Sequence, residues 1–276
     1  ARLERTQQMT GIYLILTVAV LIIAGFIAQA AIMRARRRAS MKRRLTQEQR
    51  QLVVRDFAIF ARLPESIRDE LEGLMHVFID EKSFEACGGM EEVTEHMQYV
   101  VAAQACLLLV NRKHDFYRKL RSILIYPSAY KAKNEHGDDH VRLGESWSSG
   151  SVILAWESVI AGGRNEEDGS HVSLHEFAHQ LDQEDGDADG APQLRAPSCY
   201  RTWAAVLGSE FKRIQGRREG RKIKSIINDY GATNPAEFFA VASETFFEKP
   251  RQLDEEHAEL FELLVKYYRL DPTKWT

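Results

Sequence analysis

The stretch Ser173-Leu-His-Glu-Phe-Ala-His-Gln-Leu-Asp182 decides how the C-terminal part of the chain folds. His175 and His179 are four residues apart, so on a helix both imidazoles lie on one face and can reach a single metal ion. The apolar residues of the stretch occupy a separate face, which predicts that this helix packs into a core. Glu176 lies beside the histidine face rather than on it, a position that suits a general base acting on a metal-bound water. The stretch therefore predicts a buried helix that carries two metal ligands.

A catalytic zinc centre needs a third protein ligand and one open position for water. Asp182 shares the histidine face, but it follows His179 by only three residues. A hydrogen bond from its short side chain to an imidazole N–H therefore fits better than direct metal binding. The other candidates are Glu237 and Glu244, which share one face of a second predicted helix, Pro235 to Phe247.

This second helix has a well-marked start, with Asn234 as N-cap and a proline at the first position. Its two glutamates are about 10 Å apart along the helix axis, so both cannot easily bind one ion. Glu237 has an alternative role as a capping-box residue that folds back on Asn234. The alternative for Glu244 is simple exposure to solvent. Spacing alone leaves the choice of the third ligand open.

Two further polar motifs have the spacing of metal sites but fit one poorly. His171 lies four residues before His175, but a third helical histidine would crowd the site. The segment Asp185-Gly-Asp-Ala-Asp-Gly190 begins like a calcium-binding EF-hand loop, but its twelfth position is Ala196 instead of glutamate. A solvated acidic turn is the better interpretation of this segment.

The remainder of the C-terminal part predicts an α+β domain that is rich in helices and has a small sheet. Apolar residues recur at helical spacing over Gln51–Phe60 and Val93–Val110. Short runs rich in β-branched residues predict strands at Ser122–Tyr126 and Ser151–Trp156. Charge and glycine predict an exposed loop over Lys131–Ser149, and Gly162-Gly163 through Gly169 predicts a polar turn.

The N-terminal segment has the length and composition of a membrane anchor. The 23 residues from Gly11 to Met33 carry no charge and would reach about 35 Å as a helix, enough to cross a hydrocarbon core. A cleaved signal peptide is the main alternative, but its apolar core would be shorter and its positive charge would come first. We therefore expect residues 1–10 as a flank, 11–33 as a transmembrane helix, 34–45 as a basic juxtamembrane linker and 46–276 as the main domain.

The charges on either side of this segment predict its orientation. Seven lysines and arginines lie between Arg34 and Arg44, whereas only Arg2 and Arg5 precede the span. The positive-inside bias therefore predicts a single-pass protein of the cell inner membrane with its main domain in the cytoplasm. A basic run beside a membrane span more often contacts anionic lipid than nucleic acid. The net charge of −3 gives no global attraction to nucleic acid either, and we expect no direct nucleic-acid partner.

Several motifs together resemble the zinc peptidases of the Mlc titration factor A family, and the resemblance covers roughly Gln47 to the C-terminus. The segment Asn234–Ala240 is also similar to the catalytic domain of anthrax lethal factor, whose fold is zincin-like. The motifs are His175-Glu-Phe-Ala-His-Gln-Leu-Asp182, Tyr230-Gly-Ala-Thr-Asn-Pro-Ala-Glu-Phe-Phe-Ala240, Ala102-Ala-Gln-Ala-Cys-Leu-Leu-Leu109 and Ile125-Tyr-Pro-Ser-Ala-Tyr130.

The resemblance implies a role for each matching residue. His175, His179 and Glu237 would bind one Zn²⁺ per chain, Glu176 would be the general base, and Tyr230 would help to stabilise the transition state. The fold would be zincin-like, with the metal-binding helix beneath a small sheet. The strand Ser151–Trp156 would be the edge along which an extended peptide pairs. Unlike the better-known members, this chain has an N-terminal membrane span, so partners of soluble relatives do not carry over directly.

The sequence as a whole favours a zinc-dependent peptidase that hydrolyses peptide bonds by metal-activated water. It leaves aminopeptidase and endopeptidase action open. The alternative is a membrane-tethered regulatory protein that sequesters a transcriptional repressor, as the resemblance to Mlc titration factor A suggests. The intact Glu176 argues against a purely structural metal site, which would need no base beside a water position. A third possibility is a scaffold that acts through the basic linker and tolerates loss of His175 or Glu176.

Overall fold

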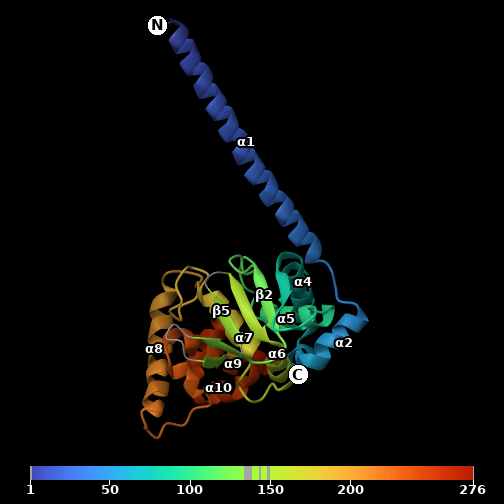
Figure 1. The fold of residues 1–276 in the computed structure, drawn as a ribbon. Coiled ribbons are helices and arrows are strands. Elements are labelled where there is room, and N and C mark those ends of the chain that lie inside the picture. The colour runs from blue at the N-terminus through green and yellow to red at the C-terminus, as the bar shows by residue number, and fades with distance from the viewer. Residues whose placement is uncertain (1, 134–138, 143, 148–149, 276) are drawn as a thin grey trace. The chain divides into compact units, whose positions relative to one another are not determined.

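The computed structural model describes residues 2–133, 139–142, 144–147 and 150–275. The chain divides into two compact units, Ala1–Arg43 and Arg44–Thr276 (Figure 1). The second unit contains the residues predicted to bind metal, and each unit is described by itself below.

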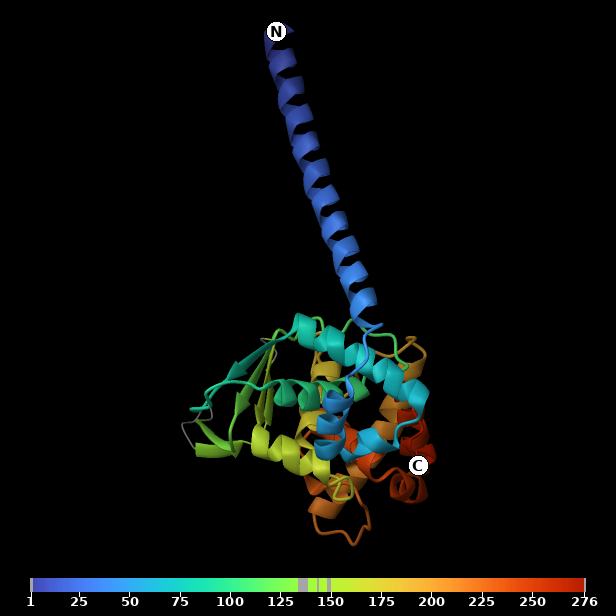
Figure 2. The same cartoon turned by 90° about the vertical axis from the view of Figure 1, so that its right-hand side faces the viewer.

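The first unit is built on one unbroken helix, α1 (Arg2–Ser40; Figure 2). Leu16–Ser40 is apolar and long enough to cross a membrane, with a mean hydropathy of 2.4 over its most apolar window. Large apolar side chains along it are exposed, Leu21 and Phe26 by 66% and 67%. An exposed apolar surface of this kind suits a lipid environment. The side chains of residues 11–15, the start of the predicted span, lie outside the described residues, and the helix continues into the predicted linker as far as Ser40.

The second unit is mostly helical. Its helices are α2 (Gln47–Asp56), α3 (Ala58–Arg62), α4 (Glu65–Glu81), α5 (Glu95–Leu107), α6 (Trp156–Arg164), α7 (Val172–Asp182), α8 (Cys199–Arg218), α9 (Pro235–Glu248), α10 (Pro250–Glu256) and α11 (Ala258–Tyr268). Two 3₁₀ turns, η1 (Asp229–Ala232) and η2 (Pro272–Lys274), complete the helical elements of the described residues. The predicted helix-rich character of the domain is confirmed.

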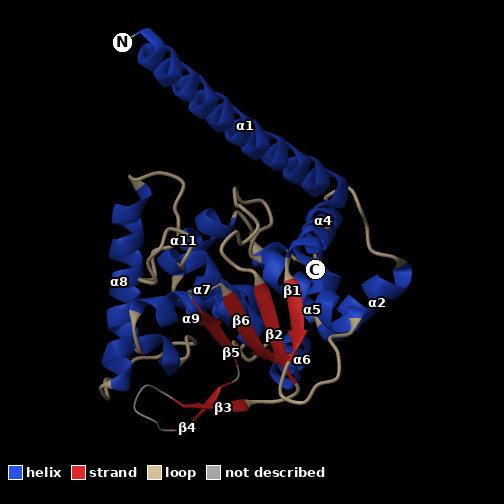
Figure 3. Cartoon of the chain, turned by 45° about the horizontal axis from the view of Figure 1, so that its top comes forward, coloured by secondary structure: helices blue, strands red, loops and turns tan. Residues whose placement is uncertain are grey.

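A four-stranded sheet lies within this unit, with strand order β1 (Ser83–Ala86), β2 (Ser122–Tyr126), β6 (Ser151–Ala155) and β5 (Gly144–Trp147). The first three strands are parallel, and β5 is antiparallel to β6 (Figure 3). The inner strands β2 and β6 have fully buried aliphatic side chains, which explains why both could be recognised from their β-branched sequences. A separate hairpin is formed by β3 (Tyr130–Lys133) and β4 (Asp139–Arg142).

Two predictions about the strands are wrong. Ser151–Trp156 was expected at the edge of the sheet, but β6 is an inner strand because β5 pairs with its other side, and Trp156 begins α6. Lys131–Ser149 was expected to be a loop, but most of β3, together with β4 and β5, lies in this segment. Edge and hairpin strands gain their main-chain hydrogen bonds without a buried side-chain row, so their sequences can stay polar.

The predicted polar turn at Gly162-Gly163 is also wrong, because both glycines lie inside α6 and are buried. A Cβ on Gly163 would be 2.2 Å from the carbonyl oxygen of Asp56, and one on Gly162 would be 3.1 Å from the Cα of His171. Glycine is needed here for the close approach of α6 to neighbouring main chain, and not for a turn.

The contact between α7 and α9 positions the predicted metal ligands. These two helices pack against each other, and α7 also contacts β5 and β6 (Figure 3). Both helix starts are capped: the His171 side chain accepts a hydrogen bond from Leu174 N–H, and Asn234 accepts one from Glu237 N–H. The buried aromatic residues of α9 fix its rotation, so that its acidic face meets the histidine face of α7.

Candidate metal centre

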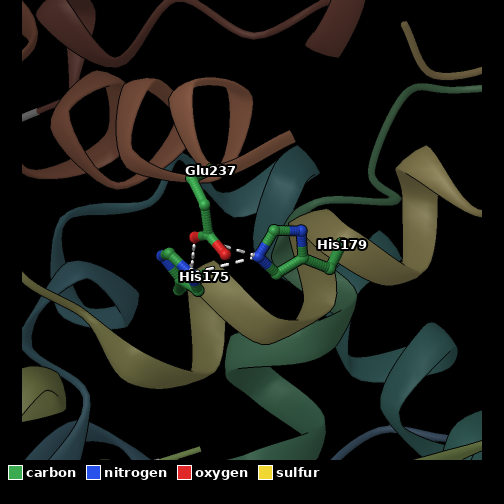
Figure 4. A group of neighbouring side chains, drawn as sticks. All are labelled: His175, His179 and Glu237. Atoms are coloured by element: carbon green, nitrogen blue, oxygen red, sulfur yellow. Dashed lines mark hydrogen bonds and ion pairs between the residues drawn. The ribbon is translucent and has the colours of Figure 1, made fainter. Parts of the chain in front are cut away.

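His175 and His179 of α7 and Glu237 of α9 come together at one point (Figure 4). One potential ligand atom from each residue lies within 4.8 Å of the other two. The distance from His175 Nε2 to His179 Nε2 is 3.1 Å, and Glu237 Oε2 is 3.0 Å and 3.4 Å from these two nitrogens. The spacing of the sequence therefore leads to a compact cluster of two nitrogens and one oxygen.

The spacing of the three atoms fits a small tetrahedral ion. Ligand atoms about 2.0–2.1 Å from a tetrahedral zinc lie about 3.3 Å from one another, close to the distances found here. Glu237 Oε2 is also buried, and within the described part of the chain it has no well-oriented hydrogen-bond partner. A buried carboxylate oxygen at this point is stabilised by positive charge, which a bound metal ion would supply. Two imidazoles and a carboxylate are a donor set that zinc prefers.

The Glu237 side chain faces the two imidazoles, so the alternative of a capping-box side chain that folds back on Asn234 is wrong. The backbone N–H of Glu237 donates to Asn234 Oδ1 at 2.9 Å, which satisfies one free donor at the start of α9. Its carboxylate does not return to Asn234 but points between the two imidazoles (Figure 4). The N-cap therefore fixes the first turn of α9 and so the direction of the Glu237 side chain.

Glu244 is buried behind His175, so the alternative of solvent exposure is wrong. Its Oε1 is 2.8 Å from His175 Nδ1, and its Oε2 accepts a hydrogen bond from the backbone N–H of His171. A carboxylate oxygen accepts hydrogen bonds, so His175 Nδ1 donates this one and leaves Nε2 to face the cluster. The seven-residue spacing, two helical turns, placed Glu244 on the face of Glu237, but only the packing of α9 on α7 reveals this supporting role.

Asp182 and His171 both have structural roles outside the three-atom cluster. Asp182 was expected to bond an imidazole, but its Oδ2 accepts from Gly190 N–H, and Oδ1 has no hydrogen-bond partner in the described part of the chain. His171 is the N-cap of α7 and packs edge-on against Phe57, away from the three-atom cluster. Burial lowers the pKa of His171 to about 3, so its ring is neutral.

The acidic segment after α7 forms short turns. Asp185 Oδ1 accepts from Asp187 N–H, and Asp189 Oδ1 accepts from Ala191 N–H. These are local bonds of each aspartate to the main chain two residues on. They agree with the interpretation of this segment as an acidic turn.

The Glu176 side chain is buried, whereas the Tyr230 side chain is exposed to solvent. Glu176 is only 6% exposed, and its charge is one of those that act on His175. Tyr230 lies on η1 and is 54% exposed, with its ring centroid 5.9 Å from that of His175. The cluster is thus approached by a buried carboxylate from α7 and by a phenol from a surface turn.

The electrostatics of the cluster favour bound positive charge. Burial alone would lower the pKa of His175, but the carboxylates of Glu237 and Glu244 outweigh it and raise that pKa well above its usual value. Burial would raise the pKa of Glu237, but the two imidazoles outweigh it and lower that pKa to about 2. Glu237 is therefore ionised at any physiological pH, as a metal ligand must be.

Glu248, one turn beyond Glu244, has the opposite behaviour. Burial, with the charges of Asp168 and Glu244, raises the pKa of Glu248 to about 9, although the nearby N–H groups of Gly169 and Ser170 oppose this. The carboxyl group is therefore protonated in the folded protein at neutral pH. Glu248 is not one of the three converging metal ligands, but its protonation makes the free energy of unfolding depend on pH.

We expect Glu248→Gln to make the folded protein less sensitive to alkaline pH. The pKa of Glu248 is higher in the folded than in the unfolded protein. The contribution of its protonated carboxyl to the free energy of unfolding is therefore fully present below about pH 4.5 and is lost as the pH rises toward 9. Glutamine imitates the neutral acid, so the melting temperature of the variant should exceed that of the wild type at pH 8–9, with the difference shrinking toward pH 5. Glu255→Gln, at an exposed site on α10, is the control. An equal pH dependence in the wild type and the Glu248 variant would contradict the assignment.

The fold and the cluster together define a class: helix-rich domains in which two packed helices present a donor set of the kind that catalytic metal centres use. Residues 32–269 match the family described as glucose-regulated metallo-peptidase M90, and the chain belongs to this metallopeptidase family. The family implies a divalent metal as cofactor.

Individual relatives agree with this family. Mlc titration factor A of Klebsiella pneumoniae subsp. pneumoniae is 31% identical over 229 residues, which cover 78% of this chain and 83% of that protein. Mlc titration factor A of Salmonella agona is 30% identical over 215 residues, covering 74% and 79%. An uncharacterised protein of Synechocystis sp. is 38% identical over 222 residues, covering 77% and 80%. The resemblance to the Mlc titration factor A family is thereby confirmed.

Proposed function

We propose that this chain is a membrane-anchored, zinc-dependent peptidase with one Zn²⁺ held by His175, His179 and Glu237. The observation that carries the proposal is the convergence of two imidazole nitrogens and an ionised carboxylate oxygen at tetrahedral spacing. A glutamate adjacent in sequence to the first histidine supports a catalytic rather than a structural centre, because only a catalytic centre needs a base beside its water position.

The residues of the chain have separate roles in this mechanism. When bound, zinc polarises the scissile carbonyl and lowers the pKa of a water toward about 7. Glu176 takes the proton from the attacking water and delivers it to the leaving amine. Glu244 holds the His175 ring in the tautomer that points Nε2 at the metal. Tyr230 donates a hydrogen bond to the oxyanion that develops on the substrate.

The same geometry supports a zincin-like arrangement, in which a sheet edge beside the metal-binding helix holds the substrate. In the described residues β5 is one of the two edge strands of the sheet, on the side of β6, and it contacts α7. An extended peptide can pair with the free edge of β5 and so pass its scissile bond over the histidine face. The substrate edge is therefore β5, in place of the inner strand β6.

The N-terminal unit supports a single-pass anchor in the cell inner membrane. The apolar part of α1 is followed by the cations of residues 34–44, which favours a cytoplasmic location for the peptidase domain, residues 46–276. Residues 34–45 would then lie against anionic lipid headgroups.

A second function is favoured by the names of the relatives. Mlc titration factor A is named for Mlc, so this chain could instead bind a transcriptional regulator at the membrane. In that case peptide hydrolysis would be absent or incidental. Peptide hydrolysis needs Glu176 as general base, whereas binding of a transcriptional regulator does not.

Hydrolysis of a mixed set of peptides, with free and with blocked N-termini, tests the proposed activity. We expect cleavage by the full chain in nonionic detergent, its loss with a zinc chelator, and its return when zinc is added. Preference for free N-termini would indicate aminopeptidase action. A zinc-loaded, folded protein that cleaves none of the set would favour the regulator-binding function.

Tyr230→Phe is expected to lower kcat by about 10²-fold with little change in KM, because the phenol oxygen is removed and the ring is kept. Zinc content should be unchanged, since the proposed ligands are His175, His179 and Glu237. The measurement is steady-state hydrolysis of one cleaved peptide. If kcat stays within about twofold of the wild type, Tyr230 is only a packed surface residue.

A further inference from the structure

A large cleft lies apart from the metal centre, with a volume of about 1170 Å³. Its walls come from the segment that follows α5, the segment between α7 and α8, the start of α8 and the C-terminal half of α11. None of the predicted metal ligands, nor Glu176 or Tyr230, lines it. The proposed peptidase mechanism therefore does not explain this cleft.

The cleft concentrates positive charge in a chain that is negative overall. Seven lysine and arginine side chains line it against two carboxylates, whereas the whole chain has a net charge of −3. Such an excess in a concave site focuses the field and attracts anions. Because cations repel one another, an anion that enters the cleft would reduce the repulsion among them.

Some of these cations are held in place and others are free to bind. Arg112 stacks on the ring of Tyr267, 4.1 Å from its centroid, and donates to Leu108 O at 3.2 Å. Lys113 and Arg195 have no ion pair or hydrogen bond with any residue that the structure describes. The cleft thus combines one preorganised guanidinium with two flexible, unpaired charges.

Two buried polar atoms of the cleft wall also lack a partner among the described residues. They are Oε1 of Glu184 and the hydroxyl of Tyr267, which lies beside the Arg112 guanidinium without a well-oriented hydrogen bond. The ring of Tyr267 is fixed between Arg112 and Trp203, whose centroid is 5.2 Å away. Buried polar groups are normally hydrogen-bonded, so these two atoms are available to a ligand that enters the cleft.

We propose that this cleft binds a soluble small molecule that carries two or more phosphate groups. One arginine guanidinium can donate two parallel hydrogen bonds to two oxygens of a phosphate group. Several cations in one cleft favour a ligand with more negative charge than a single carboxylate carries. The phenol of Tyr267 donates to a phosphate oxygen, and Glu184 accepts from a hydroxyl group of the ligand. The volume is of the order of small-molecule sites, about 300–1,000 Å³, and the cations of this site line a concave cleft.

Inorganic pyrophosphate is the probe, titrated into the full chain in nonionic detergent at about 0.15 M salt and followed by calorimetry. We expect one saturable site per chain. The double variant Lys113→Ala/Arg195→Ala should bind about tenfold or more weakly, because two charge-assisted bonds are lost. Lys212→Ala/Arg251→Ala removes the same charge from exposed sites outside the cleft and should bind like the wild type.

His179→Ala separates this proposal from the proposed peptidase, because pyrophosphate also binds zinc. Binding retained in His179→Ala supports the cleft, whatever the fate of the peptidase activity. Loss of binding in that variant, an equal loss in both double variants, or no saturable binding by the wild type would each overturn the proposal. So would tighter binding of phosphatidic-acid micelles or of a single-stranded oligonucleotide that pyrophosphate does not displace.

Discussion

Glu176→Gln should lower the rate of peptide hydrolysis by about 10³-fold while the protein keeps its zinc. General acid–base groups contribute about 10²–10⁴-fold, and glutamine cannot accept the proton of the attacking water. The side chain is 6% exposed, and glutamine has nearly the same shape, so the fold should be preserved. The measurement is kcat/KM for a cleaved peptide, with zinc content determined on the same sample.

Glu157→Gln, an exposed carboxylate on α6, is the matched control and should leave both quantities unchanged. An active Glu176→Gln variant with full zinc would contradict the assignment of Glu176 as base. If the variant instead loses zinc, Glu176 contributes to metal binding, and the loss of activity says nothing about proton transfer.

Glu237→Ala should abolish stable zinc binding. The variant leaves only two imidazoles, and two ligands do not hold a catalytic zinc against dialysis. Glu244→Gln should weaken zinc binding less, by about 10- to 100-fold, as is typical when the partner of a ligand histidine is changed. Glutamine at position 244 can still accept from His175 Nδ1, but without a charge.

Zinc competition with a chromophoric chelator measures both affinities. Glu259→Ala, at an exposed site on α11, is the control for removal of a carboxylate. If Glu237→Ala binds zinc as tightly as the wild type, the third ligand is another residue. If Glu244→Gln is the more damaging change, the roles of the two glutamates are exchanged.

The two helices that carry the proposed metal ligands could be predicted from sequence patterns within each helix. The four-residue spacing of His175 and His179 and the separate apolar face predict the buried helix that becomes α7. Asn234 followed by Pro235 marks the start of α9, which begins at the predicted residue and ends one residue beyond the predicted end. These signals depend only on neighbours in sequence, so tertiary packing did not change them.

The features that sequence analysis missed depend on contacts between distant segments. Edge strand β5 has the short sequence Gly-Glu-Ser-Trp, which lacks the β-branched run that marks a strand. Gly163 looked like a turn residue, but the carbonyl of Asp56, more than a hundred positions earlier, leaves no room for a Cβ. The role of Glu244 depends on the register in which α9 meets α7, and spacing along one helix does not define that register.

X-ray absorption at the zinc edge, on the full chain purified with zinc, tests the metal centre most directly. We expect about one zinc per chain, with only nitrogen and oxygen ligands at about 2.0–2.1 Å and the scattering of two imidazole rings. In His179→Ala the signal of one imidazole should disappear. A sulfur ligand at about 2.3 Å, or a folded wild-type chain that binds no zinc, would contradict a centre built from His175, His179 and Glu237.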